Sequence, residues 1–159
     1  MLFRSPIVFA SHGRAFHARV VLYDPQRDVA VLYVPGLRAR SLAFAGQAET
    51  GSNAIVAGYP LNERFTAVPA RIGNQQSANS PNIYQTKTVT RDIYTVRAVV
   101  RPGNSGGPLL APGGSVYGVV FAAAVDAHDT GYALTAGEVA SDVSTGRTAT
   151  GSVSTQGCD

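Results

Sequence analysis

The sequence predicts an all-β fold, a barrel or a sandwich, with one helix near its C-terminal end. Glycine, valine and threonine recur along the 159 residues, and 17 of these are glycine; this mixture suits short strands joined by tight turns. Seven or more short segments alternate between apolar and polar residues or run continuously apolar. With 45% hydrophobic and 14% charged residues, the chain is globular, and its length suits one domain or two small, closely packed lobes.

The first third of the chain reads as strands. A short apolar run covers 6–10, and His12–Gly13 follows as a turn signal. Residues 16–21 alternate with the period of a half-buried strand. Pro25 fixes a turn within 23–27, and the continuous apolar run 29–34 then predicts a buried strand.

The middle of the chain continues the pattern. Residues 38–51 predict a loop with one brief strand, and this loop is a plausible lobe boundary. The polar stretch 74–82 is rich in Ser, Asn and Gln and predicts an exposed loop. The remaining predicted strands are 53–57, 65–72, 90–100, 108–110, 116–124 and 132–134.

The predicted helix begins with a capping box. Thr135 and Glu138 have the spacing at which each side chain satisfies a backbone N–H near the other residue. Val139 and Val143 then lie four residues apart on one face. Gly146 ends the helix, and the Ser-, Thr- and Gly-rich tail 147–159 is predicted to be flexible.

The charge pattern argues against a nucleic-acid partner. The formal net charge is +3 and the pI is about 9.3, but no basic run is interleaved with aromatic residues. The arginines are instead scattered, beginning with Arg14, Arg19, Arg27, Arg38, Arg40, Arg64 and Arg71. Neither a metal-binding cluster nor a phosphate-binding loop appears in the sequence, so we expect no metal and no cofactor.

The sequence shows neither a membrane span nor an N-terminal secretory signal. No stretch approaches the ~18 apolar residues of a membrane span, and residues 1–10 are too short and too interrupted for a secretory signal. The protein is therefore either cytoplasmic or has its targeting segment elsewhere. The single cysteine, Cys158, is either a free thiol on the tail or the half of a disulfide to a partner outside this chain.

The segment 103–108, GNSGGP, carries the chemistry. A serine attacks a carbonyl only when a base takes its proton and a pocket of dipoles accepts the oxyanion. Glycines on both sides of Ser105 allow a tight backbone turn. Such a turn can aim the N–H groups of Gly103 and Ser105 at one point, which is an oxyanion hole. A Gly-rich turn without any chemistry is the alternative.

The string GNSGGPL resembles the nucleophile loop of chymotrypsin-like (trypsin-fold) serine proteases, whose pattern is G-[DN]-S-G-G-P. The resemblance implies that Ser105 is the nucleophile. Asp28 opens DVAVLYV, which is similar to the D-[VIL]-A-[VL]-L context of the orienting aspartate in this superfamily and in its high-temperature-requirement branch. A triad needs a buried carboxylate to hold the histidine, and Asp28 at the mouth of a buried strand suits that role. Its competitor Asp24 precedes Pro25 and reads as a turn residue.

The same resemblance implies a substrate pocket walled by the segments after the nucleophile. It assigns Val99 to the pocket floor and Ala122, Ala123, Ala124 and Tyr132 to the walls. No acidic residue stands among these positions. We therefore expect a neutral, fairly apolar pocket without trypsin-like preference for Lys or Arg.

The resemblance is narrower than the superfamily. Over residues 6–158 the chain resembles the membrane-anchored periplasmic trypsin-fold protease of mycobacteria. The similar runs are YDPQRDVAVLYVPGL, VAGYP, FTAVPARI, VTRDIYTVRA, GVVFAAAV and TGYALTAGEVA. That family joins a colicin-V-production-type membrane region to a protease domain and is linked to acid and oxidative stress resistance. The resemblance implies that Cys158 forms a disulfide to a missing segment and that the domain lies in an oxidising, extracytoplasmic compartment.

The sequence departs from the family at the histidine. The expected T-[NA]-x-H-V-V segment is absent, and His12, His17 and His128 each read as ordinary surface residues. Either the chain is N-terminally truncated, so that the base and the membrane anchor lie in a missing segment, or it is a pseudoprotease.

We thus expect a trypsin-like double β-barrel with an incomplete first barrel. The expected function is that of a serine endopeptidase, which in its full-length form acts on peptide or protein substrates. The alternative function is a non-catalytic peptide-binding module. The predicted divisions are a first-barrel remnant (1–40), a connection (41–52), a second barrel (53–134), a helix (135–146) and a tail (147–159).

Overall fold

The computed structural model describes residues 6–10 and 13–157 of the chain. A short 3-10 helix covers Pro60–Asn62. The remaining elements are β1 (Ile7–Phe9), β2 (Ala15–His17), β3 (Arg19–Asp24), β4 (Val29–Tyr33), β5 (Asn53–Gly58), β6 (Thr66–Pro81), β7 (Thr88–Arg97), β8 (Pro108–Leu110), β9 (Val116–Ala123), β10 (Thr130–Thr135) and α1 (Ala136–Gly146).

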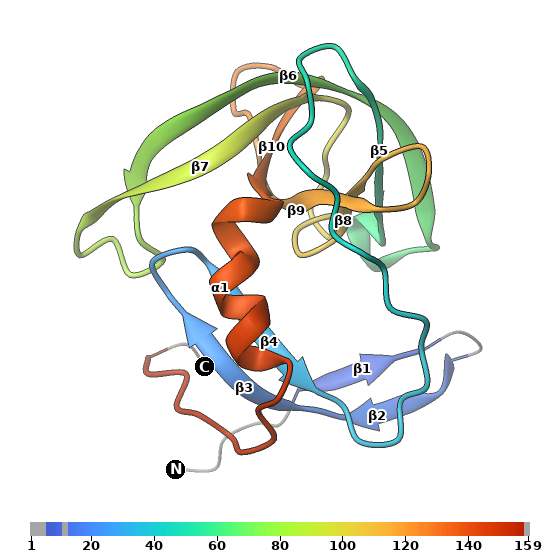
Figure 1. Ribbon diagram of the computed structural model, residues 1–159, viewed down its shortest axis with the longest axis vertical. Coiled ribbons are helices and arrows are strands. Elements are labelled where there is room, and N and C mark those ends of the chain that lie inside the picture. Colours follow the sequence, from blue (N-terminus) through green and yellow to red (C-terminus); the bar gives the residue numbers. More distant parts are fainter. Residues whose placement is uncertain (1–5, 11–12, 158–159) are drawn as a thin grey trace.

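Six strands close into a barrel in the order β10-β7-β6-β5-β8-β9 (Figure 1). All of its neighbouring strands run antiparallel. The first four strands form two separate two-stranded sheets, β1–β2 and β3–β4. The prediction of an all-β fold with one C-terminal helix is confirmed, and within the described residues only the strands from β5 to β10 close a barrel.

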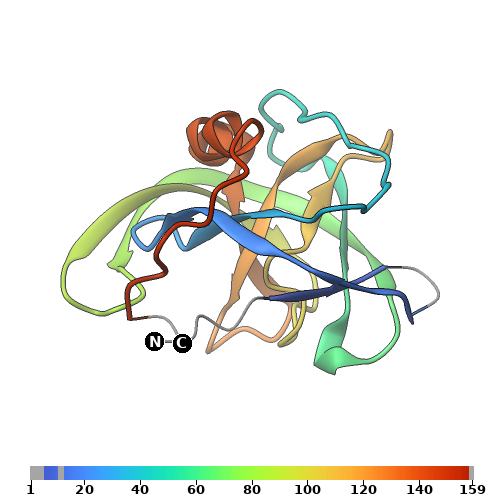
Figure 2. The ribbon, with the colours of Figure 1, turned by 90° about the horizontal axis from the view of Figure 1, so that it is seen from below.

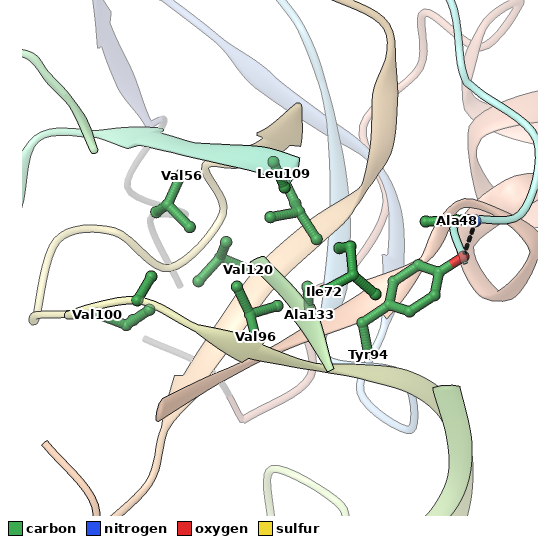
Figure 3. Packing of buried hydrophobic residues seen from close by; sticks show 11 residues of the cluster. Ala48, Val56, Ile72, Tyr94, Val96, Val100, Leu109, Val120 and Ala133 are labelled. Atoms are coloured by element: carbon green, nitrogen blue, oxygen red, sulfur yellow. Dashed lines mark hydrogen bonds between the residues drawn. The ribbon is translucent and has the colours of Figure 1, made fainter. Parts of the chain in front are cut away.

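The barrel interior is filled by small and branched side chains (Figure 3). Alternation along each strand brings inward-facing residues from different strands together. Tyr94 is the largest of them, and its hydroxyl accepts a hydrogen bond of 2.8 Å from the backbone N–H of Ala48. The connection from β4 to β5 is thereby tied to the barrel core. The labelled core residues are Ala48, Val56, Ile72, Tyr94, Val96, Val100, Leu109, Val120 and Ala133.

The predicted exposed loop at 74–82 is wrong for most of its length, because β6 continues to Pro81. It pairs with β7 along this stretch, for example Ser77 with Asp92 and Asn79 with Thr90. The side chains are polar because this part of the β6–β7 hairpin is largely exposed. Cross-strand hydrogen bonds stabilise it, among them Thr90 Oγ1 to Asn79 Oδ1 at 2.7 Å.

Helix α1 begins and ends as predicted, but its capping box is only half formed. The Thr135 hydroxyl accepts a hydrogen bond of 3.0 Å from the N–H of Glu138. The Glu138 carboxylate does not return to the helix start; it accepts from Arg27 Nε and from the Asp92 N–H, both at 3.0 Å. The helix lies between the barrel and the β3–β4 hairpin (Figure 1), so Glu138 is used for tertiary contacts instead.

Two irregular segments join the hairpins to the rest of the fold. The connection from β4 to β5 pairs with β9, where Ala45 N donates to Val116 O and Val116 N donates to Ala43 O, each at 2.8 Å. The tail after α1 crosses the β3–β4 hairpin (Figure 2), and Val153 N donates to Val20 O at 2.9 Å. Flexibility of this tail stays a prediction, as do the division boundaries. Over the described residues, no helix is both long and apolar enough to cross a membrane.

Candidate active site

Ser105 lies on the loop between β7 and β8, and two glycines determine the path of that loop. Gly103 has φ +94 and Gly106 has φ +81, values that residues with a side chain rarely adopt. A Cβ on Gly103 would lie 2.3 Å from the carbonyl oxygen of Tyr59. At Gly103, therefore, the loop is pressed against the chain that follows β5, and only glycine fits there without strain.

Hydrogen bonds hold the loop in place from within and from the barrel. Inside it, Asn104 N donates to Arg101 O at 3.0 Å, and Gly107 N donates to Asn104 O at 2.9 Å. From the barrel, Val120 exchanges bonds with the loop: its carbonyl accepts from Gly106 N at 2.8 Å, and its N–H donates to Gly107 O at 2.9 Å. Asn104, next to the serine, is buried, with 3% exposure, and its side-chain Oδ1 has no hydrogen-bond partner among the described residues.

The loop leaves Ser105 exposed. Its hydroxyl donates one hydrogen bond, of 3.3 Å, to the carbonyl of Phe121. Within the described part of the chain, neither the Gly103 N–H nor the Ser105 N–H has a hydrogen-bond partner. These are the two groups that the sequence predicts as the oxyanion hole, and both are free to donate a hydrogen bond to a ligand oxygen.

Asp28 ends the tight turn between β3 and β4. It has φ +61 and is exposed, so the expectation of a buried carboxylate at this position is wrong. The reason is structural: β3 and β4 pair only with each other, and β4 is half-buried or exposed along its length. Nothing in the described residues covers the carboxylate of Asp28.

Asp24 behaves as the predicted turn residue. Its Oδ1 accepts from the N–H groups of Gln26 and Arg27 at 2.8 and 3.1 Å, and its Oδ2 accepts from Arg27 Nη1 at 2.7 Å. Burial alone would raise the pKa of Asp24. The hydrogen bonds from Arg27 and Gln26, with the charge of Arg27, outweigh burial and hold that pKa below its ordinary value.

The predicted pocket residues are placed on neighbouring strands. Ala122 pairs with Tyr132 across β9 and β10, and Ala123 pairs with Gly131. Ala124 follows β9, and its N–H donates to Thr130 O at 2.9 Å. Val99 is 50% exposed just after β7.

None of these predicted pocket residues lines either of two cavities elsewhere in the fold. The larger, of about 530 Å³, lies between helix α1 and the connection at Phe44–Gln47. The smaller, of about 240 Å³, lies beside Arg27 and Glu138. The specificity pocket thus stays a prediction from the resemblance.

Comparison with known proteins decides the family. Residues 6–119, which include Asp28 and Ser105, match the model of the trypsin-like peptidase domain. The chain belongs to the trypsin-like peptidase family. It is similar to serine protease Rv3671c of Mycobacterium tuberculosis (strain H37Rv), with 52% identity over 129 residues. It is also similar to the serine protease Do-like HtrB of Bacillus subtilis (strain 168), with 30% identity over 112 residues that make up 68% of this chain and 24% of that relative.

Solved structures agree with this membership in the trypsin-like peptidase family. The crystal structure of the active form of the M. tuberculosis Rv3671c protease matches with a TM-score of 0.92 and 47% identity, covering 96% of this chain and 67% of that chain. The inactive form matches with a TM-score of 0.79, 49% identity, and coverage of 87% and 70%. The predicted trypsin-like fold and the resemblance to the mycobacterial protease are therefore confirmed. The Rv3671c match takes in 80% of this chain and 32% of that protein's own length.

This trypsin-like peptidase chain has no histidine at its nucleophile in the described residues. His17 is exposed on β2, and His128 is exposed in the turn before β10. Neither hydrogen bonds to Ser105, whose hydroxyl bonds to the Phe121 carbonyl instead. His12 and Cys158 lie outside the described residues, so the pairing implied for Cys158 stays a prediction. No group of three or more metal-ligating side chains occurs among the described residues.

Sequence reasoning missed the contacts around Arg91 and Glu138. Arg91 is buried on β7, with 4% exposure, and donates to the carbonyl of Gln26. A signal was available: in TVTRDIYTV, Arg91 lies two residues before Ile93 and so on the same face of the strand. An arginine on a core-facing position usually has a structural or functional task.

Proposed function

We propose that this chain is the nucleophile-bearing part of a serine endopeptidase that cleaves peptide bonds through an acyl-enzyme. The observation that carries the proposal is the loop at Ser105, which leaves the hydroxyl exposed and two adjacent N–H groups unpaired. Relatives named serine proteases support it. The neutral surroundings of Val99 and Ala122–Ala124 favour a substrate with an apolar side chain next to the scissile bond.

The chemistry proceeds in two halves. Ser105 Oγ attacks the carbonyl carbon of the scissile bond while its proton passes to a general base. The carbonyl oxygen becomes an oxyanion, which accepts hydrogen bonds from the N–H groups of Gly103 and Ser105. Return of the proton to the departing amine breaks the C–N bond and leaves an ester on Ser105. Water, deprotonated by the same base, then releases the acid product and restores the hydroxyl.

The base is a histidine that this chain does not supply, and Asp28 orients it. His17 and His128 are exposed, and neither hydrogen bonds to Ser105. In another serine protease, loss of the triad histidine lowers kcat by about 10⁶-fold. We expect the 159-residue chain by itself to hydrolyse peptides little, if at all.

A second candidate function is a non-catalytic module that binds peptides in the same groove. The hydrogen bond from Ser105 Oγ to the Phe121 carbonyl, where an active nucleophile would donate to a base, favours it. The two candidates differ in the coding sequence upstream of Met1. An in-frame H-V-V segment there supports the protease, and an upstream region that encodes none supports the binding module.

Labelling with a fluorophosphonate probe tests the proposal directly. The whole protein should be labelled at Ser105, and the Ser105→Ala variant should not. The 159-residue chain should be labelled slowly at best. Fast labelling of that chain would contradict the assignment of the base and would direct attention to His12 or His17. A whole protein that resists the probe yet binds peptides would establish the binding module instead.

An extracytoplasmic location is part of the proposal. A similar protein of Chlamydia trachomatis (strain D/UW-3/Cx), 32% identical over 109 residues, is named a probable periplasmic serine endoprotease. Membrane anchoring and a role in stress resistance rest on the family resemblance alone. Cells that express the whole protein can be fractionated and the fraction that contains protein labelled at Ser105 identified. This experiment tests both the compartment and the membrane anchoring.

A further inference from the structure

The turn that carries Asp28 is held by a buried cation. Arg91 of β7 donates from Nε to the carbonyl of Gln26 at 2.8 Å. Its other nitrogens donate to the hydroxyl of Ser80 and, at 3.4 Å, to the carbonyl of Pro81. All of these acceptors are neutral. Burying a charged group without an ionic partner costs free energy. A buried arginine at this position is therefore best explained by its hydrogen bonds, which hold the turn.

A second anchor holds the next residue of the same turn. Arg27 Nε donates to Glu138 Oε1 at 3.0 Å, and Arg27 Nη1 donates to Asp24 Oδ2 at 2.7 Å. The other oxygen of Glu138 accepts from the N–H of Asp92 on β7 at 3.0 Å. One carboxylate on α1 therefore joins the helix, the barrel and the turn. The Glu138 side chain is 15% exposed, so solvent screens this contact less than a surface ion pair.

Asp28 has no anchor of its own. It follows Arg27 in the chain, has φ +61, and its carboxylate has no hydrogen-bond partner in the described residues. Aspartate is one of the few residues with a side chain that adopt this left-handed conformation as single residues in turns. The contacts that hold this part of the turn are thus those of its neighbours Gln26 and Arg27.

We propose that Arg91 and Glu138 are positioning residues that act through Asp28. They fasten the β3–β4 turn to the barrel that carries Ser105, and so fix the orienting carboxylate of one lobe relative to the nucleophile of the other. This inference rests on the proposed function, because it concerns the same catalytic site. It adds two residues outside the triad on which the turnover rate depends.

The first test is the Arg91→Met variant of the whole protein. We expect kcat for a peptide substrate to fall about 10- to 100-fold, the scale of a misplacement of about 1 Å. KM should change less than about twofold, because Arg91 is not one of the predicted pocket residues. The matched control is Arg71→Met on β6, whose exposed side chain reaches only Asn53, at 3.4 Å. Arg71→Met should leave kcat unchanged. Arg91→Lys, which keeps the charge and one donor, should recover part of the rate.

The second test uses Glu138→Ala, which serves even where Arg91→Met does not fold. It removes the anchor at Arg27 and should lower kcat by a similar factor without raising KM. Glu49→Ala, which alters an exposed carboxylate on the connection between the lobes, is the control. Circular dichroism establishes that each variant is folded before its rate is compared.

A double-mutant cycle with Asp28→Asn separates positioning from general damage. Asp28→Asn alone should lower kcat by about 10⁴-fold, as the same change does in another serine protease. In that background, Glu138→Ala and Arg91→Met should lower kcat less than about twofold further. An equal loss in both backgrounds, or no loss in either, overturns the positioning role. A whole protein whose rate is insensitive to Asp28→Asn, or that has no activity, overturns the proposed function itself.

Discussion

Gly103→Ala is the sharpest test of how the nucleophile loop is built. The new Cβ would lie 2.3 Å from the Tyr59 carbonyl oxygen and 3.0 Å from the Leu61 nitrogen, at a φ of +94. Forcing a side chain into the left-handed region costs about 1–2 kcal/mol. Overpacking a rigid site costs about 1–3 kcal/mol more. The free energy of unfolding should therefore fall by about 2–5 kcal/mol, a large share of the about 5–15 kcal/mol of a typical domain.

Two matched variants divide this loss into its causes. Gly106 has φ +81, but a Cβ there would meet nothing within 4 Å, so Gly106→Ala should cost only the backbone part, about 1–2 kcal/mol. Gly113 lies outside the left-handed range and also faces open space. Gly113→Ala should change stability by less than about 1 kcal/mol.

Urea denaturation followed by circular dichroism gives the three free energies on the 159-residue chain. We expect Gly103→Ala to be the most destabilised variant, Gly106→Ala the next and Gly113→Ala the least. If Gly103→Ala were no less stable than Gly106→Ala, the loop would not be pressed against the Tyr59 carbonyl. The account of how Ser105 is presented would then be refuted.

Two further variants test the barrel core and the buried acid of the helix. Tyr94→Phe leaves the buried N–H of Ala48 without its partner and should lower the free energy of unfolding by about 1–3 kcal/mol, measured as a loss of urea midpoint at unchanged slope. Burial, with the nearby charge of Asp24, raises the pKa of Asp142 in spite of the opposing charge of Arg27. Because the folded chain then holds the proton more tightly than the unfolded chain, stability falls as pH rises from the ordinary value near 3.8 through the raised value. Asp142→Asn should stabilise the protein at pH 7 and lose that gain below about pH 3.5, and a variant less stable than the parent at pH 7 would contradict this.

The strands could be predicted wherever one face meets the core. In 16–21 and 90–100, apolar and polar residues alternate because one face of each strand is buried. The start of the helix at 136–146 could be predicted from its N-cap residue, Thr135. The outer half of β6 could not be predicted, because its side chains are largely exposed and polar. A strand stabilised by backbone pairing to its partner leaves no hydrophobic period in the sequence.

The nucleophile loop could be predicted because its geometry is local. Gly103 and Gly106 lie next to the residue they present, and their positive φ values are what glycine in such a string indicates. Asp28 is different: its exposure could not be predicted, because whether a carboxylate is covered depends on elements distant in sequence. The contacts of Glu138 also depend on elements distant in sequence. Its spacing from Thr135 matches a capping box, but its carboxylate accepts hydrogen bonds from Arg27 and Asp92.

The local contacts that hold the nucleophile loop matter for both candidate functions, the enzyme and the binding module. The loop around Ser105 is held by Val120, Tyr59 and its own backbone, all within the second barrel and the segment after β5. It therefore needs neither a histidine nor Asp28 to keep its shape. A chain without a base still offers two unpaired N–H groups to a peptide carbonyl, so peptide binding by itself does not separate the two functions. What separates them is the rate at which Ser105 becomes covalently modified, since that step alone requires a base held in place by the turn at Asp28.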